Sequence, residues 1–241
     1  MSSDITLYTW NTANGVKISI TLEELGLSYK TEPINIGKNI QKEEYEYPRW
    51  FLKINPNGRI PALTDGPQRV FESGSILLYL VNKYDTDRNI SYAPDTPEYI
   101  EQVSWLMFQT GGIGPMQGQA NHFRLVASIR SDYAIKRYID ETKRLYSVLE
   151  SRLKESTYLA GSKYTIADIA NYTWVRRGPQ LLEIDLSEFP ALKNWVDEID
   201  KRPAVQKGAD VPHLDRTDEQ WNEILRNSRT RIDGMTNSDQ Y

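Results

Sequence analysis

Short alternating segments and amphipathic segments follow one another over the first 84 residues. Residues 5–9 alternate apolar and polar side chains, which is typical of a strand with one buried face. From Asn14, apolar residues recur at i, i+4 and i+7 until Gly26, a typical helix-ending residue. The same reasoning predicts strands at 29–34, 60–64 and near 70–71, and a helix at 75–83. The predicted order is βαβ followed by ββα, the order of a thioredoxin-like α/β domain.

From residue 98 onward the pattern is helical. Apolar residues recur at helical spacing around 99–107, and the glycine-rich run from Gly111 to Pro115 predicts a kink or break. Residues 134–153 form a long amphipathic stretch, and Phe189 opens another helix. We therefore predict an α/β domain at 1–84, a polar linker at 85–97, an all-helical domain at 98–207 and a polar tail at 208–241.

Two segments of the second half carry more specific expectations. Thr165 and Asp168 have the spacing of a capping box at a helix start, so we expect Asp168 to support folding and not chemistry. In the tail, Trp221, Ile224 and Leu225 predict one short docking helix. The remaining polar segment, 228–241, is expected to be disordered.

Composition narrows the function classes. The 241 residues carry 29 Lys and Arg against 33 Asp and Glu, a net charge of −4, which gives no reason to expect a nucleic-acid partner. Cysteine is absent and there are only two histidines, so disulfides and a Cys-x-x-Cys centre are excluded and no metal is expected. With neither a signal peptide nor a membrane span in the pattern, a cytoplasmic location is expected.

The stretch from Asn55 to Asp65 and the helix start after Phe71 have the chemistry of a receptor for a small peptide. Pro61 opens a strand without an N–H to donate, and a cis Ile60-Pro61 bond would leave the backbone of Ile60 unpaired for a ligand. Ser73 can cap the following helix, whose N-terminus attracts a carboxylate, and Glu72 can receive an ammonium group.

These two stretches, read as NPNGRIPAL and FESGSILLYL, resemble the glutathione site of the cytosolic glutathione transferase family. The resemblance covers nearly the whole chain, and the runs 12–17 and 37–41 are similar to the nu-class and fungal nitrogen-regulator-like branch. It implies a thioredoxin-like domain joined to an all-helical domain, a homodimer, and glutathione or glutathione disulfide as cosubstrate without a metal. It further implies a small disulfide, or an electrophile, as the second substrate.

A glutathione thiol must be acidified to react quickly near neutral pH, which calls for a donor beside the sulfur. Tyr8, Thr12 and Asn14 are the candidates around the end of the first strand. Tyr8 lies in the strand pattern, where aromatic residues usually pack. Thr12 and Asn14 lie at the helix start, where the helix dipole also favours a thiolate. The alternative for Asn14 is that it only caps the helix.

The resemblance assigns further roles to individual residues. It places Thr12 and Asn14 around the sulfur. Bacterial relatives have a proline where this chain has Ala13, so the backbone of this loop lacks the restriction that a proline would give. The resemblance implies that glutathione is held by Gln41 at its glycine end, by Ile60 and Pro61 along its cysteinyl backbone, by Glu72 and Ser73 at its γ-glutamyl end, and by Arg137 from the helical domain. A solvated Arg137 is the alternative, and Arg124, Arg176 and Arg177 are weaker candidates of the same kind.

Two functions of different class follow from these residues. The first is an enzyme that reduces disulfides with a bound glutathione thiolate and conjugates electrophiles weakly. The second is a non-catalytic glutathione-binding regulator. The regulator of yeast that the sequence resembles has a long Asn/Gln-rich extension, whereas this chain begins close to its first strand, so we expect the enzyme.

Overall fold

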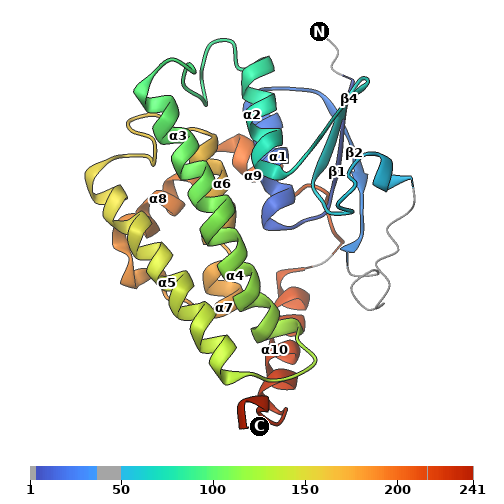
Figure 1. The fold of residues 1–241 in the computed structure, drawn as a ribbon, viewed down its shortest axis with the longest axis vertical. Coiled ribbons are helices and arrows are strands. Elements are labelled where there is room, and N and C mark those ends of the chain that lie inside the picture. Colours follow the sequence, from blue (N-terminus) through green and yellow to red (C-terminus); the bar gives the residue numbers. More distant parts are fainter. Residues whose placement is uncertain (1–3, 37–49, 216, 241) are drawn as a thin grey trace.

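The computed structural model describes residues 4–36, 50–215 and 217–240, and its N-terminal part is a four-stranded sheet covered by helices on one face (Figure 1). The strands lie in the order β2-β1-β3-β4, with β1 and β2 parallel and the other neighbours antiparallel. The bounds are β1 Ile5–Thr9, β2 Tyr29–Pro33, β3 Ala62–Asp65 and β4 Gln68–Phe71. Helices α1 (Ala13–Glu24) and α2 (Ser73–Tyr84) cover the sheet, as the thioredoxin-like prediction requires.

Alternation along β1 separates two apolar clusters on the two faces of the sheet. Leu7 pairs with Leu63 of β3, and both are buried in the large core that includes residues of α1 and α2. Tyr8 pairs with Ala62 and packs in a smaller cluster with Phe51 on the opposite face. The two-residue period of the strand therefore sets which side chains can meet α1.

The C-terminal part is entirely helical (Figure 1). Its α-helices are α3 Pro97–Phe108, α4 Gly114–Asn121, α5 Asp132–Glu155, α6 Ile166–Val175, α7 Gly178–Leu182, α8 Pro190–Asp200, α9 Pro203–Ala209 and α10 Asp218–Asp233. The short helical segments of this part are η3 Gln109–Ile113, η4 His122–Val126, η5 Leu186–Glu188 and η6 Ser238–Gln240, and η2 Phe51–Lys53 lies between β2 and β3 in the sheet part. The predicted fold class, an α/β domain followed by an all-helical one, is confirmed.

The glycine-rich run does not break its helix, so of the predicted kink or break, the break is wrong. Instead η3 is a π-helical turn that joins α3 to α4 without interruption, and the N–H of Gly114 bonds to the carbonyl of Gln109. Pro115 has no N–H to donate, and a wider turn of this kind accommodates the missing bond. Gly112 faces Leu145 of α5, and a Cβ added to it would lie 3.4 Å from that side chain.

Helix α1 joins the two parts of the molecule. It packs against α2 on one side and against α6 and α9 on the other, so the large core runs from the sheet into the helical part. Ser19 of α1 donates a 2.6 Å hydrogen bond to the carbonyl of Gly208 in α9. A Cβ on Gly208 would lie 2.6 Å from the backbone of Ile20, so only glycine allows this approach.

The C-terminal segment is ordered, so the expectation of disorder over 228–241 is wrong for the residues that the structure describes. Helix α10 has 16 residues and buries Leu225 and Ile232. Arg231 donates hydrogen bonds of 2.9 and 3.1 Å to the carbonyls of Ala127 and Leu125. Beyond α10, the Asp239 carboxylate accepts from the N–H of Tyr133 at 2.7 Å, near the start of α5. Polar side chains thus dock this segment by satisfying backbone groups far away in the sequence.

Across the described ranges, every helix is too short or too polar to cross a lipid bilayer.

Candidate functional site

A cavity of about 1030 Å³ lies between the sheet part and the helical part. It brings together the sequence-predicted residues Thr12, Asn14, Ile60 and Pro61 with the start of α2. The helical part contributes residues from α4, α6, α7 and the region of α10. Its other lining residues include Trp10, Asn11, Glu72, Ser73, Gln117, Trp174, Arg176, Arg177, Leu214 and Trp221.

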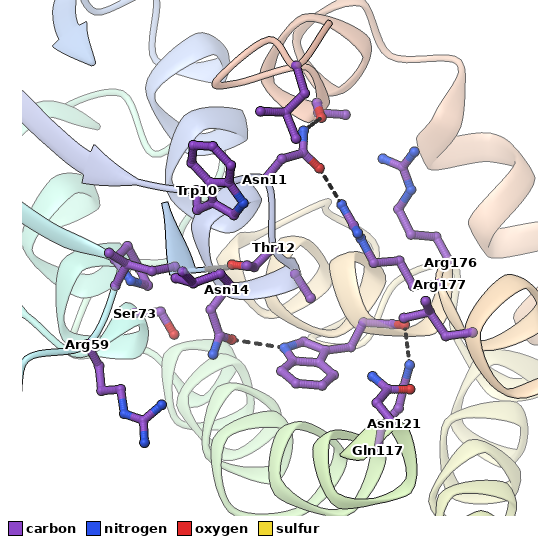
Figure 2. Close-up of a pocket in the computed structure, with 18 of the residues that line it drawn as sticks. Trp10, Asn11, Thr12, Asn14, Arg59, Ser73, Gln117, Asn121, Arg176 and Arg177 are labelled. Carbon is purple, nitrogen blue, oxygen red and sulfur yellow. Dashed lines mark hydrogen bonds between the residues drawn. The ribbon is translucent and has the colours of Figure 1, made fainter. Parts of the chain in front are cut away.

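Thr12 is the residue that caps α1. Its Oγ1 accepts a 3.1 Å hydrogen bond from the N–H of Gly15, which leaves the hydroxyl hydrogen available as a donor. Asn14 therefore is not the N-cap, so this alternative is wrong. It lies inside the first turn, and its Oδ1 accepts a 2.9 Å hydrogen bond from the indole Nε1 of Trp174 (Figure 2).

The glycine after Asn14 is required by packing. A Cβ on Gly15 would lie 2.3 Å from the carbonyl oxygen of Trp10 and 2.4 Å from Oγ1 of Thr9. Real side chains do not approach so closely, so the β1–α1 connection closes only with glycine at this position. The tight connection holds Thr12 and Asn14 at the positive end of α1, where a thiolate is favoured.

The peptide-pairing edge has the predicted geometry. The Ile60-Pro61 bond is cis, and β3 begins only at Ala62. Within the described part of the chain, no hydrogen bond to the Ile60 backbone is found. Asn55 fixes the preceding turn, because its Nδ2 donates to the carbonyl of Arg59 at 2.6 Å. The Ile60 backbone can therefore pair with an extended ligand in the cavity.

The start of α2 differs from the prediction that Ser73 caps the helix through its hydroxyl. Ser73 is the first helical residue, and the cap position is occupied by Glu72, whose side chain makes no capping bond. Glu72 has φ 66° and ψ 120°, a strained conformation that non-glycine residues rarely adopt and that is often found at functional sites. The Ser73 hydroxyl instead accepts a 3.1 Å hydrogen bond from Nζ of Lys17 on α1.

Lys17 is a functional candidate that sequence reasoning missed. Its ammonium group is buried between Ser73 and Oε1 of Gln109, and it bonds to both. Burial lowers the pKa of Lys17 to about 7, and the nearby Glu72 carboxylate partly offsets this effect. The sequence feature that could have identified it is a single lysine within an otherwise uncharged run of α1. A charged Lys17 would place a positive charge directly beneath the predicted γ-glutamyl site.

The lowered pKa of Lys17 predicts a specific pH dependence of stability. The folded chain releases this proton above about pH 7, whereas the unfolded chain keeps it to about pH 10.5, so stability rises with pH across that window. We expect the native protein to gain about 3 kcal/mol between about pH 6 and pH 9 relative to Lys17→Met. Urea unfolding of both proteins at the two pH values measures this gain.

A matched control is Lys30→Met, which removes an exposed lysine from β2 and should keep the native pH dependence. Equal pH dependence in the native protein and in Lys17→Met would show that the buried amine does not titrate in this range.

The end of α6 brings two arginines to the cavity. Arg177 donates a 2.7 Å hydrogen bond to Oδ1 of Asn11, and Nδ2 of Asn11 donates to the carbonyl of Ala209 at 3.0 Å (Figure 2). Burial lowers the pKa of Arg177 to about 10, with Arg176 adding to the effect, so the guanidinium stays charged near neutral pH. Arg176 lies over the ring of Tyr172 at 5.4 Å. Both arginines can face an anionic part of a ligand.

The other arginine candidates lie elsewhere. Arg124 forms ion pairs with Asp233 at 2.7 Å and Glu183 at 3.5 Å, so it holds α10 in place. Arg137 is exposed on α5 and does not line the cavity, so the structure of this chain does not bring it to the predicted site. Gln41, the remaining predicted contact, lies outside the described residues.

Tyr8 is separated from the cavity lining. Its ring packs against Trp50 at 5.8 Å and Phe51 at 5.9 Å between centroids, on the face of the sheet away from α1. It has the packing role that an aromatic residue in a strand usually has. Of the three candidate donors, Thr12 and Asn14 are therefore the ones that line the cavity.

The outer wall of the cavity comes from the segment that the sequence predicted as a polar tail with one short docking helix. Leu214, Thr217, Asp218 and Trp221 line it at the start of α10. The signal was the helical spacing of apolar residues around Trp221, but that pattern does not say where the helix docks. In the described part of the chain no group of three or more metal-ligating side chains occurs.

Comparison with known proteins agrees with this geometry. The family model "Glutathione S-transferase, N-terminal domain" matches residues 3–82, and "Glutathione S-transferase, C-terminal domain" matches residues 118–203. The chain is 42% identical over 208 residues to the disulfide-bond oxidoreductase YfcG of Escherichia coli, covering 83% of this chain and 92% of that protein. It is 35% identical over 251 residues to the disulfide-bond oxidoreductase YghU of the same organism, covering 97% and 82%.

Solved structures give the same result. A glutathione transferase homolog from Lodderomyces elongisporus, with two GSH per subunit, is 43% identical with a TM-score of 0.80, covering 87% of this chain and 99% of that one. A glutathione transferase from Phanerochaete chrysosporium in complex with oxidized glutathione is 39% identical with a TM-score of 0.78, covering 93% and 97%. With both halves matched by family models, and with close relatives over most of its length, the chain belongs to the glutathione transferase family.

Proposed function

We propose that this protein reduces disulfides with the thiolate of a bound glutathione. The observation that carries the proposal is the placement of Thr12 and Asn14 at the start of α1 in one cavity with Ile60, Glu72 and Ser73. The protein has no cysteine of its own, so all three sulfurs of each exchange must come from its ligands. Similar proteins named disulfide-bond oxidoreductases support the same reaction class.

The reaction proceeds as two thiol–disulfide exchanges. The glutathione thiolate attacks one sulfur of the substrate, a mixed disulfide forms, and the other sulfur leaves as a thiolate that takes a proton from water. A second glutathione thiolate then attacks the mixed disulfide, which releases glutathione disulfide and the second substrate thiol. Thr12 and Asn14 supply hydrogen bonds to the attacking sulfur, and the helix start supplies its dipole.

The size of the cavity supports room for two ligands. Sites for drug-sized molecules have volumes of about 300–1,000 Å³, and this cavity, at about 1030 Å³, is slightly larger than that range. In our assignment the Ile60, Glu72 and Ser73 side holds the first glutathione. The side lined by Arg176, Leu214 and Trp221 remains for the disulfide substrate or a second glutathione.

The glutathione-dependent reduction of 2-hydroxyethyl disulfide tests this function. Purified protein is assayed with the glutathione disulfide that forms coupled to NADPH consumption by glutathione reductase. We expect turnover at least about tenfold above the reaction without protein. Binding of glutathione disulfide without any turnover would instead support a non-catalytic binding protein, and activity confined to electrophilic carbon substrates would support conjugation as the main reaction.

The remaining features of the proposal come with the family. We propose a homodimer in the cytoplasm, with glutathione as cosubstrate and weak conjugation of electrophiles as a side activity. Size measurement of the purified protein by light scattering tests the dimer, and a mass equal to one chain of 27.9 kDa would contradict it.

A further inference from the structure

The loop between β1 and α1 is tied to the end of α6 by two side-chain contacts. Arg177 donates to Asn11, and Trp174 donates to Asn14, across 166 and 160 positions of sequence. Both acceptors belong to the sheet part and both donors to the helical part (Figure 2). Between the two contacts, Ala13 places no restriction of its own on the backbone. Contacts from the end of α6 therefore add to the local restraints on this connection, which are the Thr12 cap and the close packing of Gly15.

The contact with Trp174 decides which way the Asn14 amide points. An indole N–H can only donate, whereas an asparagine side chain has an oxygen acceptor and an NH₂ donor. The atom that faces Nε1 of Trp174 at 2.9 Å must be Oδ1, so Nδ2 of this cavity-lining residue is turned away from the indole (Figure 2). Within the described residues Nδ2 has no hydrogen-bond partner. Asn14 is thus presented to the ligand as a donor, which is what a thiolate requires.

Trp174 is itself held in place by the glycine-rich helix α4. A Cβ added to Gly114 or Gly118 would lie 3.7 and 3.5 Å from the indole ring, so the ring packs directly on this small-residue surface. Gln117, between them, donates a 2.8 Å hydrogen bond to the Trp174 carbonyl. The buried Tyr146 hydroxyl in turn donates to Oε1 of Gln117 at 2.9 Å. A continuous chain of contacts therefore fixes the position of the indole N–H.

We propose that Trp174 is a positioning residue for the glutathione thiolate, because it holds the Asn14 amide with its NH₂ toward the sulfur. This inference rests on the proposed function, since it concerns the same thiolate. It gives a reason for the glycines Gly114 and Gly118 of α4, because the Trp174 ring packs against them. It also assigns the helical part of the molecule a role at the sulfur, in addition to the outer wall of the cavity.

Trp174→Phe tests the proposal, because it removes the N–H and keeps a ring against Gly114 and Gly118. The first measurement is the pKa of the bound glutathione thiol, obtained from the ultraviolet absorbance of the thiolate as a function of pH. We expect this pKa to rise by about one unit, which is a tenfold smaller thiolate fraction below the pKa. Correspondingly, kcat for disulfide reduction should fall about tenfold near neutral pH, with KM for glutathione within about twofold of native.

Trp195→Phe is the matched control. Like Trp174→Phe, it removes an indole N–H that donates to a side-chain oxygen, here Oδ1 of Asp168 at 3.1 Å. Trp195, however, does not line the cavity. We expect lower stability and an unchanged thiol pKa. The double variant Asn14→Ala/Trp174→Phe should have the thiol pKa of Asn14→Ala alone, because Trp174 acts through Asn14. Additive shifts, or a native thiol pKa in Trp174→Phe, would overturn the proposal.

The absorbance titration does not depend on turnover. The positioning role of Trp174 can therefore be tested independently of the proposed disulfide reduction. A native protein that reduces no disulfide, but whose bound thiol pKa rises in Trp174→Phe, would refute the function and support the positioning role. If Trp174→Phe does not fold, hydrogen exchange of the six tryptophan indole N–H groups is compared between the native protein and Asn14→Ala. One resonance should lose protection, and six unchanged resonances would overturn the proposal.

Discussion

Asn14→Ala should lower the rate of glutathione-dependent disulfide reduction by about 100-fold, since removal of one preorganised donor from a developing or stabilised anion typically has this effect. The variant loses the Nδ2 donor and the acceptor of Trp174, while Thr12 still caps α1 through its bond to Gly15. The loss should therefore fall on the chemistry and leave the fold largely intact. Steady-state kinetics with 2-hydroxyethyl disulfide, together with thermal unfolding, measure the two effects separately.

Asn222→Ala is the matched control for this substitution. Asn222 is an exposed residue of α10, and it bonds to Gln180 at 3.0 Å instead of lining the site. We expect native turnover. Thr12→Ser, which keeps both the cap and the hydroxyl, should also stay close to native. If Asn14→Ala keeps native turnover while Thr12→Val loses it, the thiolate is stabilised by Thr12 and our assignment to Asn14 is wrong.

Asp168→Ala should destabilise the protein by about 3–5 kcal/mol, an effect comparable to breaking a buried polar network. The Asp168 carboxylate is fully buried and accepts hydrogen bonds from the N–H groups of Thr165 and Leu159, both at 2.9 Å, and from the indole of Trp195 at 3.1 Å. Alanine would leave these donors without a partner in the core. Chemical unfolding with glutathione disulfide binding measured on the folded fraction tests the prediction.

Asp168→Asn removes the charge of this residue and keeps its shape, so it separates the two contributions to stability. It keeps one acceptor oxygen, so we expect a smaller loss of stability than in Asp168→Ala. Burial raises the pKa of Asp168 to about 6, so between about pH 4 and 6 the folded chain holds a proton that the unfolded chain has lost. The stability contributed by the native carboxyl therefore falls as pH rises through this window, and Asp168→Asn should lack that fall. Retained stability with lost ligand binding in Asp168→Ala would indicate a role in the site instead.

The sequence by itself determined the features whose causes are local. The capping box at Thr165 and Asp168 is confirmed, with both reciprocal hydrogen bonds present, because its partners are three residues apart. Strand β1 has the predicted bounds because a two-residue period is visible within five residues. The Ile60-Pro61 edge and the segment Thr12–Asn14 were also found from short motifs. The residues of these two motifs line one cavity.

The tertiary structure decided what each buried or polar side chain faces. Lys17 looked like one charge in a helix, and only packing places its amine between Ser73 and Gln109, which are 56 and 92 positions away. The helical pattern around Trp221 was visible, but the docking of α10 depends on Arg231 bonding to carbonyls more than 100 positions away. Arg137 had a suitable side chain, yet its helix turns it to solvent outside the cavity.

The role of Asn14 shows the division most clearly. The sequence identified it as a candidate donor at a helix start, but an asparagine can present either its oxygen or its NH₂ group to a ligand. That choice is made by Trp174, 160 positions later, whose indole can only donate. Periodicity and short motifs state which residues are buried or capped, because those properties depend on neighbours in the chain. The partner across a cavity is fixed only when distant helices pack, and here that partner sets the chemistry.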